Sequence, residues 1–197
     1  MSTILNALSD SRVAELLRQG GVGILPTDTV YGLVCRAADQ AAVARLYQIK
    51  SREHKPGTII AAGTGQLVDL GIKARYLKAV EHFWPNSISI EIPHSLAYLS
   101  QTTGRQAFRI VQGPAGLLTL LEQVGPLLTS SANPPGQSSA GTIIQAQAYF
   151  GDTVDFYVEG GDLTDRKPST LIRIVDDAIE VLREGAVDID ESGKIKA

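Results

Sequence analysis

Short apolar runs alternate with helix-like patterns along the whole of this 197-residue sequence. Four or five aliphatic residues bounded by Gly or Pro are typical of buried strands, whereas apolar residues spaced by three and four are typical of amphipathic helices. This alternation favours an α/β fold in which helices cover a sheet. No linker-like or low-complexity segment interrupts the pattern, and the length fits one domain. We therefore expect a single α/β domain with a twisted, mixed sheet, flanking helices and a polar tail after Gly185.

The individual elements follow from periodicity and from start and stop signals. Asp39 precedes an apolar pattern and is a good helix N-cap, and Gly20-Gly21 ends the first helix. Ile88, Ile90 and Ile92 alternate with polar residues, which predicts a half-buried strand. A tight turn at Asp176-Asp177 predicts a closing hairpin. Helices are expected at 12–19, 40–50, 74–83, 115–124 and 142–150, and strands at 22–25, 58–62, 87–92, 106–111, 127–129, 154–158, 170–175 and 178–183.

The composition limits the cellular compartment and the classes of binding partner that suit this chain. Hydrophobic residues make up 44% and aromatic residues 6% of the chain, so the core should be aliphatic. The net charge of −3 is unlike that of general nucleic-acid binders, so any anion site must be local. One cysteine, Cys35, allows no intrachain disulfide and fits a reducing compartment. No signal peptide is visible and no apolar run reaches the length of a membrane span, so we expect a cytoplasmic protein.

Polar residues follow the first expected strand directly, in the segment PTDTVYGL at 26–33. Loops at strand ends are where α/β proteins usually hold ligands. The hydroxyls of Thr27 and Thr29 and the carboxylate of Asp28 suit the polar groups of an amino acid. The alternative is an ordinary turn whose hydroxyls bond their own backbone.

Two further polar segments carry cations or small hydroxyl residues. Lys50, Arg52 and Lys55 lie at and beyond a helix C-terminus, where they suit a polyphosphate or simply complement the helix dipole. The small residues of Ser130–Asn133, with Ser138, Ser139 and Gly141 beyond them, let a backbone approach phosphate oxygens closely. A strand that runs straight into such residues favours a site over a flexible surface loop.

Two arginines fall on expected strands. Ser169 leads into one strand of the closing hairpin, Arg183 lies on the other, and Arg109 lies on an earlier strand. An arginine beside a small hydroxyl residue suits a carboxylate or a phosphate. The alternative is a surface cation on an exposed strand face.

Several common sites are missing from the sequence. It has no GxxxxGK[ST] segment, and Gly63–Gly65 lacks the third glycine and the context of a dinucleotide fingerprint. His54, His82 and His94 lack metal-ligand spacing, and Cys35 has no partner. No Ser-His-Asp or Cys-His set can be assembled. We expect no protein metal site.

Together these motifs resemble the YrdC/Sua5 family, the threonylcarbamoyl-AMP synthases, over about residues 9–185, which leaves 186–197 as the tail. The chain resembles the short, single-domain type. The matching segments, in the family's order, are PTDTVYGL at 26–33, KSR at 50–52, FWPNSISI at 83–90, TGRQAFRIV at 103–111, SSAN at 130–133 with PPG after it, PST at 168–170 and VLREG at 181–185.

The resemblance implies a role for each matching residue. Lys50 and Arg52 correspond to the ATP-phosphate contacts at the reacting centre. The rest of the nucleotide site would be Ser131, Asn133, Ser139 and Arg183. The threonine pocket would be Thr29, Arg109, Thr129 and Ser169, with Thr27 as a neighbour.

The resemblance also implies a reaction. L-Threonine and bicarbonate give N-carboxythreonine, whose carboxylate attacks the α-phosphate of ATP, and pyrophosphate leaves. Such a transfer needs alignment and charge stabilisation more than a protein nucleophile. Mg²⁺ would arrive with ATP. Separate tRNA threonylcarbamoyltransferase proteins would use the product for N6-threonylcarbamoyladenosine modification of tRNA, and a weak affinity for tRNA itself stays open.

Two alternatives remain at this point: a non-catalytic RNA-binding protein of the same fold, and a paralogue with an altered substrate. The net charge and the lack of aromatic residues among the basic ones count against RNA binding. The intact triplet Lys50–Arg52 favours the ordinary ATP chemistry. The paralogue remains open because the sequence departs from the family pattern at Glu53, Ala61, Asn86 and Gly113-Pro114.

Overall fold

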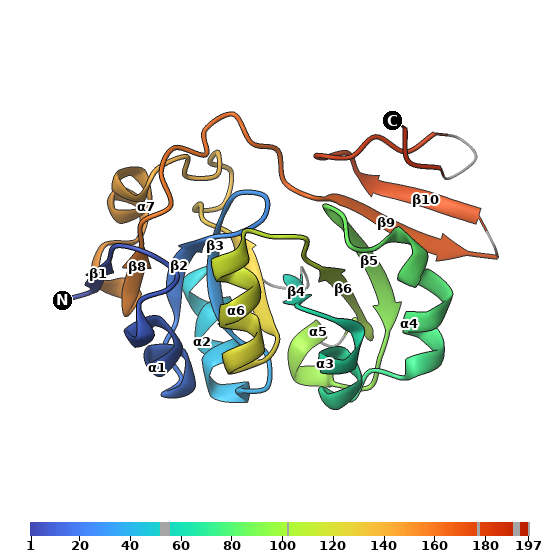
Figure 1. Cartoon of the computed structure of the whole chain (residues 1–197), viewed down its shortest axis with the longest axis horizontal. Helices are drawn as coiled ribbons and strands as arrows, with labels where there is room; N and C mark the ends of the chain where they lie inside the picture. The colour runs from blue at the N-terminus through green and yellow to red at the C-terminus, as the bar shows by residue number, and fades with distance from the viewer. Residues whose placement is uncertain (52–55, 102, 177, 191–193, 197) are drawn as a thin grey trace.

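A computed structural model of the chain describes residues 1–51, 56–101, 103–176, 178–190 and 194–196. The described residues form a sheet of ten strands in the order β1-β8-β2-β3-β7-β4-β6-β5-β9-β10 (Figure 1). The strands are β1 (Thr3–Leu5), β2 (Gly23–Pro26), β3 (Tyr31–Arg36), β4 (Thr58–Ala61), β5 (Ile88–Pro93), β6 (Arg105–Ile110), β7 (Leu127–Ser131), β8 (Phe156–Val158), β9 (Thr170–Val175) and β10 (Ala178–Arg183).

The sheet contains both parallel and antiparallel pairs of neighbouring strands. β4 pairs in parallel with β6 and antiparallel with β7, while β5 pairs antiparallel with β6 and in parallel with β9. The closing hairpin β9–β10 is antiparallel. The prediction of a mixed sheet with flanking helices is therefore confirmed. The helices are α1 (Ser11–Arg18), α2 (Gln40–Ile49), α3 (Thr64–Asp69), α4 (Ala74–Val80), α5 (Ala97–Ser100), α6 (Ala115–Val124) and α7 (Ile143–Phe150).

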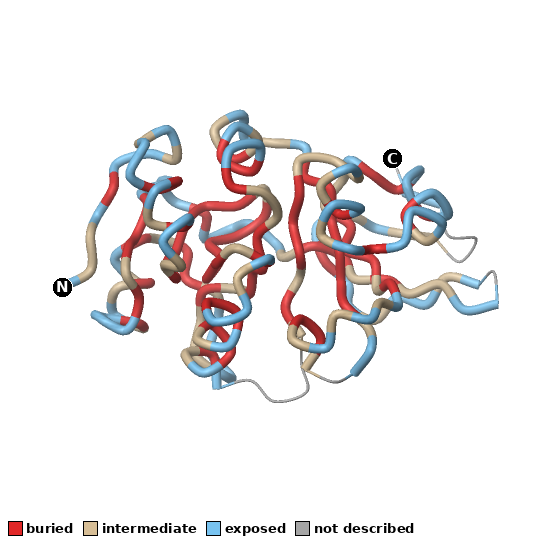
Figure 2. Tube along the Cα trace, turned by 90° about the horizontal axis from the view of Figure 1, so that it is seen from below, coloured by how far each residue is buried: buried red, intermediate tan, exposed pale blue. Residues whose placement is uncertain are grey.

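The sheet separates two apolar clusters. Strand residues alternate between faces, so Ile59 and Ile60 of β4 fall in different clusters. One cluster packs beneath α1 and α6, and the other beneath α2, α3, α4, α5 and α7. Figure 2 shows the buried segments running through the middle of the molecule, with exposed segments around them. The cluster beneath α1 and α6 takes its strand residues from β1, β2, β3, β4, β7 and β8, so among the described residues it leaves β5, β6, β9 and β10 uncovered on this face.

Polar residues occupy the same face beyond α6. On β5, Ile88, Ile90 and Ile92 enter the cluster beneath α4, so Ser89 and Glu91 point to the opposite face. Arg109 of β6 likewise alternates with Phe108 and Ile110, which lie in that cluster. This uncovered half of the sheet is where the polar side chains gather.

The expected helices and strands are largely confirmed. The helix expected at 115–124 and the strands expected at 170–175 and 178–183 have the predicted bounds. The helix expected at 74–83 ends at Val80, and a 3₁₀ turn (Glu81–Phe83) continues it. The elements β1, β3, α3 and α5 were not predicted. β3 is the informative omission, because Tyr31 begins a central, buried strand and only Thr27–Val30 forms the turn.

Side-chain caps mark the beginnings of the helices α1, α2 and α7. The Asp39 carboxylate accepts a hydrogen bond from the amide of Ala42 at 3.0 Å, as predicted for α2. Asp10 caps α1 by accepting from the amide of Arg12, and Thr142 caps α7 by accepting from the amide of Gln145.

The segment after Gly185 is attached at its start. The amide of Ala186 donates to the carbonyl of Pro168 at 2.8 Å, and the amide of Val187 donates to Oγ1 of Thr170 at 3.1 Å. A Cβ on Gly185 would lie 2.4 Å from the Pro168 carbonyl oxygen, so glycine is required for this approach. The first residues of the expected tail thus lie against the segment that leads into β9, which includes Pro168 and Thr170 on either side of Ser169. Within the described part of the chain, no helix combines the length and apolarity needed to cross a membrane.

His94 gives the fold a predicted pH dependence. Its Nδ1 accepts from the amide of Leu96 at 3.0 Å, and its Nε2 is buried without a partner among the described residues. Burial lowers the pKa of His94 below 6.5, so the folded state binds fewer protons than the unfolded chain. The free energy of unfolding should therefore decrease as the pH falls from about 6.5 toward the lowered folded pKa.

The matched variant is His94→Asn, whose Oδ1 can accept from the same amide but does not titrate. Urea unfolding at pH 7.5 and at pH 5.5 should show a smaller decrease in this variant than in the wild type. An equal decrease in both proteins would assign the pH dependence to other groups.

Candidate functional site

A cavity of roughly 440 Å³ opens on the uncovered half of the sheet. Its walls come from the turn after β2 and from β3, β4, β5, β6, β7, β9 and β10. All the residues predicted for the threonine pocket line it, and two predicted nucleotide contacts join them. These are Thr27, Thr29, Arg109, Thr129 and Ser169, with Ser131 and Arg183.

The turn between β2 and β3 is held by its own hydroxyls. Oγ1 of Thr27 donates to the carbonyl of Val30 at 2.7 Å and accepts from the amide of Thr29 at 3.2 Å. The Thr27 hydrogen is therefore used within the turn, as the alternative of an ordinary turn predicted. Thr29 Oγ1 lies 3.1 Å from Thr27 Oγ1 and lines the cavity beside it. Thr29 is thus better placed than Thr27 to contact a ligand.

Gly32 makes room for the Thr129 hydroxyl on the neighbouring strand. A Cβ at Gly32 would lie 2.5 Å from Thr129 Oγ1, which real Cβ atoms essentially never approach. The glycine of the PTDTVYGL segment therefore keeps the β3–β7 floor of the cavity open.

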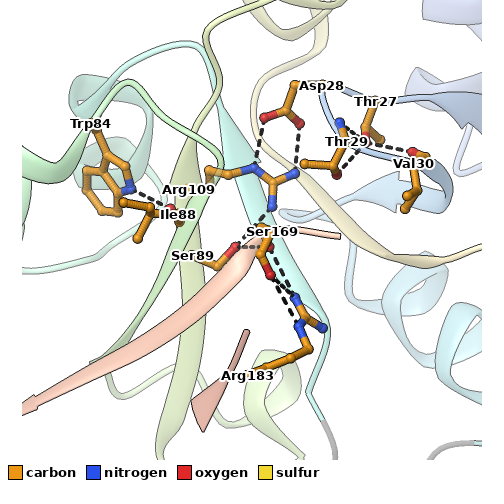
Figure 3. Close-up of polar contacts among 10 residues, drawn as sticks. All are labelled: Thr27, Asp28, Thr29, Val30, Trp84, Ile88, Ser89, Arg109, Ser169 and Arg183. Carbon is orange, nitrogen blue, oxygen red and sulfur yellow. Dashed lines mark hydrogen bonds and ion pairs between the residues drawn. The ribbon is translucent and has the colours of Figure 1, made fainter. Parts of the chain in front are cut away.

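Arg109 forms a buried ion pair with Asp28 (Figure 3). Its Nε donates to Oδ2 of Asp28 at 3.0 Å and its Nη2 donates to Oδ1 at 2.8 Å, while the two side chains are 3% and 6% exposed. Its Nη1 donates to Oγ of Ser89 at 2.9 Å. Because this two-pronged contact is occupied, a ligand carboxylate would meet only the remaining N–H groups of Arg109.

A second arginine, Arg183, reaches the cavity from β10 of the closing hairpin. Nε and Nη2 of Arg183 donate to the carbonyl of Ser169 at 3.2 and 2.8 Å, and Nη2 also reaches its hydroxyl at 3.1 Å. The hydroxyls of Ser169 and Ser89 lie 2.8 Å apart. Hydrogen bonds thus join the predicted threonine residues to Arg183.

Lys50 ends α2 and is 4% exposed. Its ammonium donates to the carbonyls of Ser131 and Asn133 and, at 2.8 Å, to Oδ1 of Asn133. Oδ1 of Asn133 also accepts from Oγ of Ser131 at 2.6 Å. The structure therefore places Lys50 against the predicted nucleotide loop, where its three donors hold the loop in shape.

The other predicted nucleotide residues have different outcomes. Asn133 and Lys50 line a second cavity of roughly 940 Å³, and Ser131 lines both cavities. Ser139 lines neither, but its Oγ is buried without a hydrogen-bond partner among the described residues. Arg52 lies outside the described residues, as does the departure at Glu53.

Positive charge is concentrated around the first cavity although the chain is acidic overall. Arg105, Arg109, Arg173 and Arg183 line it. Arg173 is paired with Glu91, its Nη2 lying 2.7 Å from Oε2. For Arg105, the described residues provide no side-chain hydrogen bond or ion pair, so its guanidinium is available to an anion.

Tyr31 supports the wall next to the β2–β3 turn. Burial raises the pKa of Tyr31 to about 12, so the phenol stays protonated and donates to the carbonyl of Gly161 at 2.9 Å. It also accepts from the amide of Gly160 at 2.8 Å. A Cβ at Gly160 would lie 2.4 Å from Pro26, so this glycine permits the contact.

The described carboxylates of the site are already engaged, Asp28 with Arg109 and Glu91 with Arg173. Among the described residues, no three His, Cys, Asp or Glu side chains are close enough to hold a metal ion. Mg²⁺ prefers oxygen ligands and commonly stays on the phosphates of a nucleotide. Its delivery with ATP remains a prediction.

Asp28 and Ser89 both contact Arg109 in the structure, and the sequence identified neither contact. Asp28 stands between Thr27 and Thr29, and Ser89 lies among the isoleucines of β5. A polar residue at an alternate position of an apolar strand was the available signal for Ser89. The departures at Ala61, Asn86 and Gly113 do not line the first cavity, and Ala61 packs in the cluster beneath α2.

A helix-flanked mixed sheet with a polar, arginine-lined cavity on its uncovered half defines an α/β domain whose cavity suits small anionic molecules. The model of the Sua5/YciO/YrdC family, described as "Telomere recombination", matches residues 15–185. The chain belongs to this family.

Named relatives and solved structures agree with this assignment. Threonylcarbamoyl-AMP synthase of Stutzerimonas stutzeri is 31% identical over 81% of this chain and 89% of its own length. The crystal structure of P. abyssi Sua5 complexed with L-threonine superposes with a TM-score of 0.82 at 26% identity, covering 94% of this chain and 58% of that one. E. coli YciO has the same fold, with a TM-score of 0.80 at 23% identity, covering 95% and 98%. The chain therefore spans under two thirds of Sua5 but most of the bacterial synthase.

Proposed function

We propose that this chain is a threonylcarbamoyl-AMP synthase, a nucleotidyltransferase that forms L-threonylcarbamoyladenylate from L-threonine, bicarbonate and ATP. The observation that carries the proposal is the single cavity that gathers Thr29, Arg109, Thr129 and Ser169 with Arg183. Family membership and the bacterial relatives named as synthases support the same reaction. The complex of Sua5 with L-threonine supports the amino acid as one substrate.

The chemistry requires two reactants to be aligned in the cavity. Threonine and bicarbonate give N-carboxythreonine with loss of water. Its carboxylate oxygen forms a bond to the α-phosphorus of ATP as the bond from that phosphorus to the α,β-bridging oxygen breaks, and the β- and γ-phosphates leave as pyrophosphate. Neither step needs a covalent intermediate on the protein, so holding the groups in line is the main requirement.

The site residues have the properties that this alignment needs. Arg109 is immobilised by Asp28 and can present its remaining N–H groups without reorganising. Arg105 and Arg183 supply charge for phosphate oxygens at the rim. Lys50 keeps the loop of Ser131 and Asn133 in place beside them. Mg²⁺, when bound with ATP, would neutralise part of the phosphate charge.

The product implies partners that act after this chain. An acyl adenylate is a reactive mixed anhydride, so a second protein must transfer its threonylcarbamoyl group to tRNA. We propose separate tRNA threonylcarbamoyltransferase proteins for this step. Weak binding of tRNA by the chain itself remains part of the proposal.

The choice of amino acid tests the proposal. With ATP, Mg²⁺ and bicarbonate, pyrophosphate release should be fastest with threonine, slower with serine and slowest with valine. Valine leaves buried hydroxyls of the pocket unpaired, at about 1–3 kcal/mol. Serine lacks one methyl group, at about 1 kcal/mol. Enzyme-coupled detection of pyrophosphate and mass detection of the adenylate provide the measurement.

The other outcomes distinguish the alternatives. Equal rates with the three amino acids would favour the paralogue with an altered substrate. Salt-dependent binding of tRNA with no ATP-dependent release of pyrophosphate would favour the RNA-binding protein.

A further inference from the structure

Two serine hydroxyls, those of Ser89 and Ser169, lie between the buried guanidinium of Arg109 and the guanidinium of Arg183. Oγ of Ser89 accepts from Nη1 of Arg109 at 2.9 Å, and Oγ of Ser169 accepts from Nη2 of Arg183 at 3.1 Å (Figure 3). The two oxygens lie 2.8 Å apart. Both arginines are donors, so neither hydroxyl can direct its own hydrogen toward them.

The number of hydrogens then limits the arrangement. Each hydroxyl carries one hydrogen, and the contact between the two oxygens uses one of the two. The other hydrogen must point elsewhere. The direction of the Ser89–Ser169 hydrogen bond therefore decides which serine has a hydrogen to offer.

The burial of Ser89 decides which of the two serines donates in the Ser89–Ser169 hydrogen bond. Ser89 is 0% exposed and does not line the cavity, and the described residues offer its hydroxyl no other acceptor. If Ser169 donated to Ser89, the Ser89 hydrogen would be buried without an acceptor, which is unfavourable. If Ser89 donates to Ser169, the remaining hydrogen belongs to Ser169, which lines the cavity and can reach water or a ligand.

We propose that Ser89 is a positioning residue that makes the Ser169 hydroxyl a hydrogen-bond donor into the cavity. The ligand atom at Ser169 is then an acceptor, such as a carboxylate oxygen, and not an ammonium. The identity of this ligand atom rests on the proposed function: it is a carboxylate oxygen of L-threonine. The neighbouring guanidinium groups favour the same negative charge.

A double-mutant cycle on threonine binding tests this coupling. Isothermal titration calorimetry of the full chain would compare the wild type, Ser89→Ala, Ser169→Ala and the double variant. Ser169→Ala should weaken threonine binding by about tenfold, as expected for a hydrogen bond to a charged group. Ser89→Ala should weaken it by several-fold, and the double variant should be no weaker than Ser169→Ala. Losses that multiply in the double variant would overturn the proposal.

The matched control is Ser100→Ala. Ser100 is also fully buried, but its Oγ has no hydrogen-bond partner among the described residues. This variant should bind threonine like the wild type, which separates the coupling from the general effect of removing a buried hydroxyl. Thermal unfolding midpoints of all variants, measured in parallel, show whether each one is folded at the titration temperature.

The ligand's carboxylate is tested with L-threoninol, in which a hydroxymethyl group replaces it. L-Threoninol should bind the wild type weakly, and Ser169→Ala should change that binding far less than it changes threonine binding. Equal losses for both ligands would show that Ser169 does not meet the carboxylate.

A ligand-free measurement keeps this inference separate from the proposed function. In proton NMR spectra, the hydroxyl hydrogen of Ser89 should exchange slowly with water and that of Ser169 rapidly. The reverse order would overturn the assigned direction even in an active synthase. Absence of threonine binding and of pyrophosphate release in the wild type would instead refute the proposed function and leave the NMR result to decide the direction.

Discussion

Asp28→Ala should lower the free energy of unfolding by about 3–5 kcal/mol, because it leaves the Arg109 guanidinium buried without its counter-charge. Small domains are typically stable by about 5–15 kcal/mol, so much of the stability would be lost. Threonine-dependent release of pyrophosphate should fall with it, since Arg109 would no longer be held. Urea unfolding and the pyrophosphate assay measure the two effects.

A double variant separates stability from function. Asp28→Ala/Arg109→Met removes both charges, and such replacements are often close to neutral, so unfolding should return toward the wild-type value. Threonine-dependent activity should remain lost. Arg12→Ala is the control, because it breaks an exposed pair with Asp10 and should leave the free energy of unfolding nearly unchanged. A double variant as unstable as Asp28→Ala would contradict the pairing as the source of the effect.

Lys50→Met should weaken ATP binding by about 10- to 150-fold, equivalent to roughly 1.5–3 kcal/mol. Methionine keeps most of the apolar stem and removes the ammonium that bonds the Ser131 and Asn133 carbonyls. The loop then loses its support at the same time as the site loses a positive charge. Titration with ATP and Mg²⁺, followed by calorimetry, gives the affinity.

Two further variants interpret that result. Lys78→Met removes an exposed lysine of α4 and should leave ATP affinity unchanged. Asn133→Ala removes one of the three acceptors of Lys50 and should reproduce part of the loss if Lys50 acts through the loop. Wild-type ATP affinity in Lys50→Met would exclude Lys50 from the site.

The resemblance to the YrdC/Sua5 family predicted which residues would meet, but not how they would pair. Thr29, Arg109, Thr129 and Ser169 were placed on or beside strands, and strands assemble their ends and faces into one surface. The partners of Arg109 depend on cross-strand register, which periodicity alone does not specify. The Asp28 and Ser89 contacts therefore became visible only in the structure.

The fold shows the same division between local and long-range information. The hairpin of β9 and β10 followed from two alternating runs and a turn. The order of the strands did not, because it depends on contacts between distant segments. β3 was missed because its first residues belong to a segment interpreted as a loop, although Tyr31 already pairs with Pro26. The sequence likewise did not show that the hydrogen bonds of the Lys50 ammonium are made within the protein, because its acceptors include backbone carbonyls far along the chain.

The closing hairpin, which carries Arg183, stands late in the sequence, and this position bears on the order in which the site forms during folding. The hairpin also contains a register shift. Val181 pairs with Ile172 while Arg183 pairs with Leu171, so the strand is locally irregular just before Arg183, and such irregularities re-aim side chains. During synthesis from the N-terminus, Asp28, Ser89 and Arg109 emerge well before Ser169 and Arg183. A nascent chain can therefore form the buried ion pair early, whereas the cavity becomes complete only when the last two strands dock beside β5. The ability to bind the nucleotide should therefore appear as the final event of folding, after most of the core has formed.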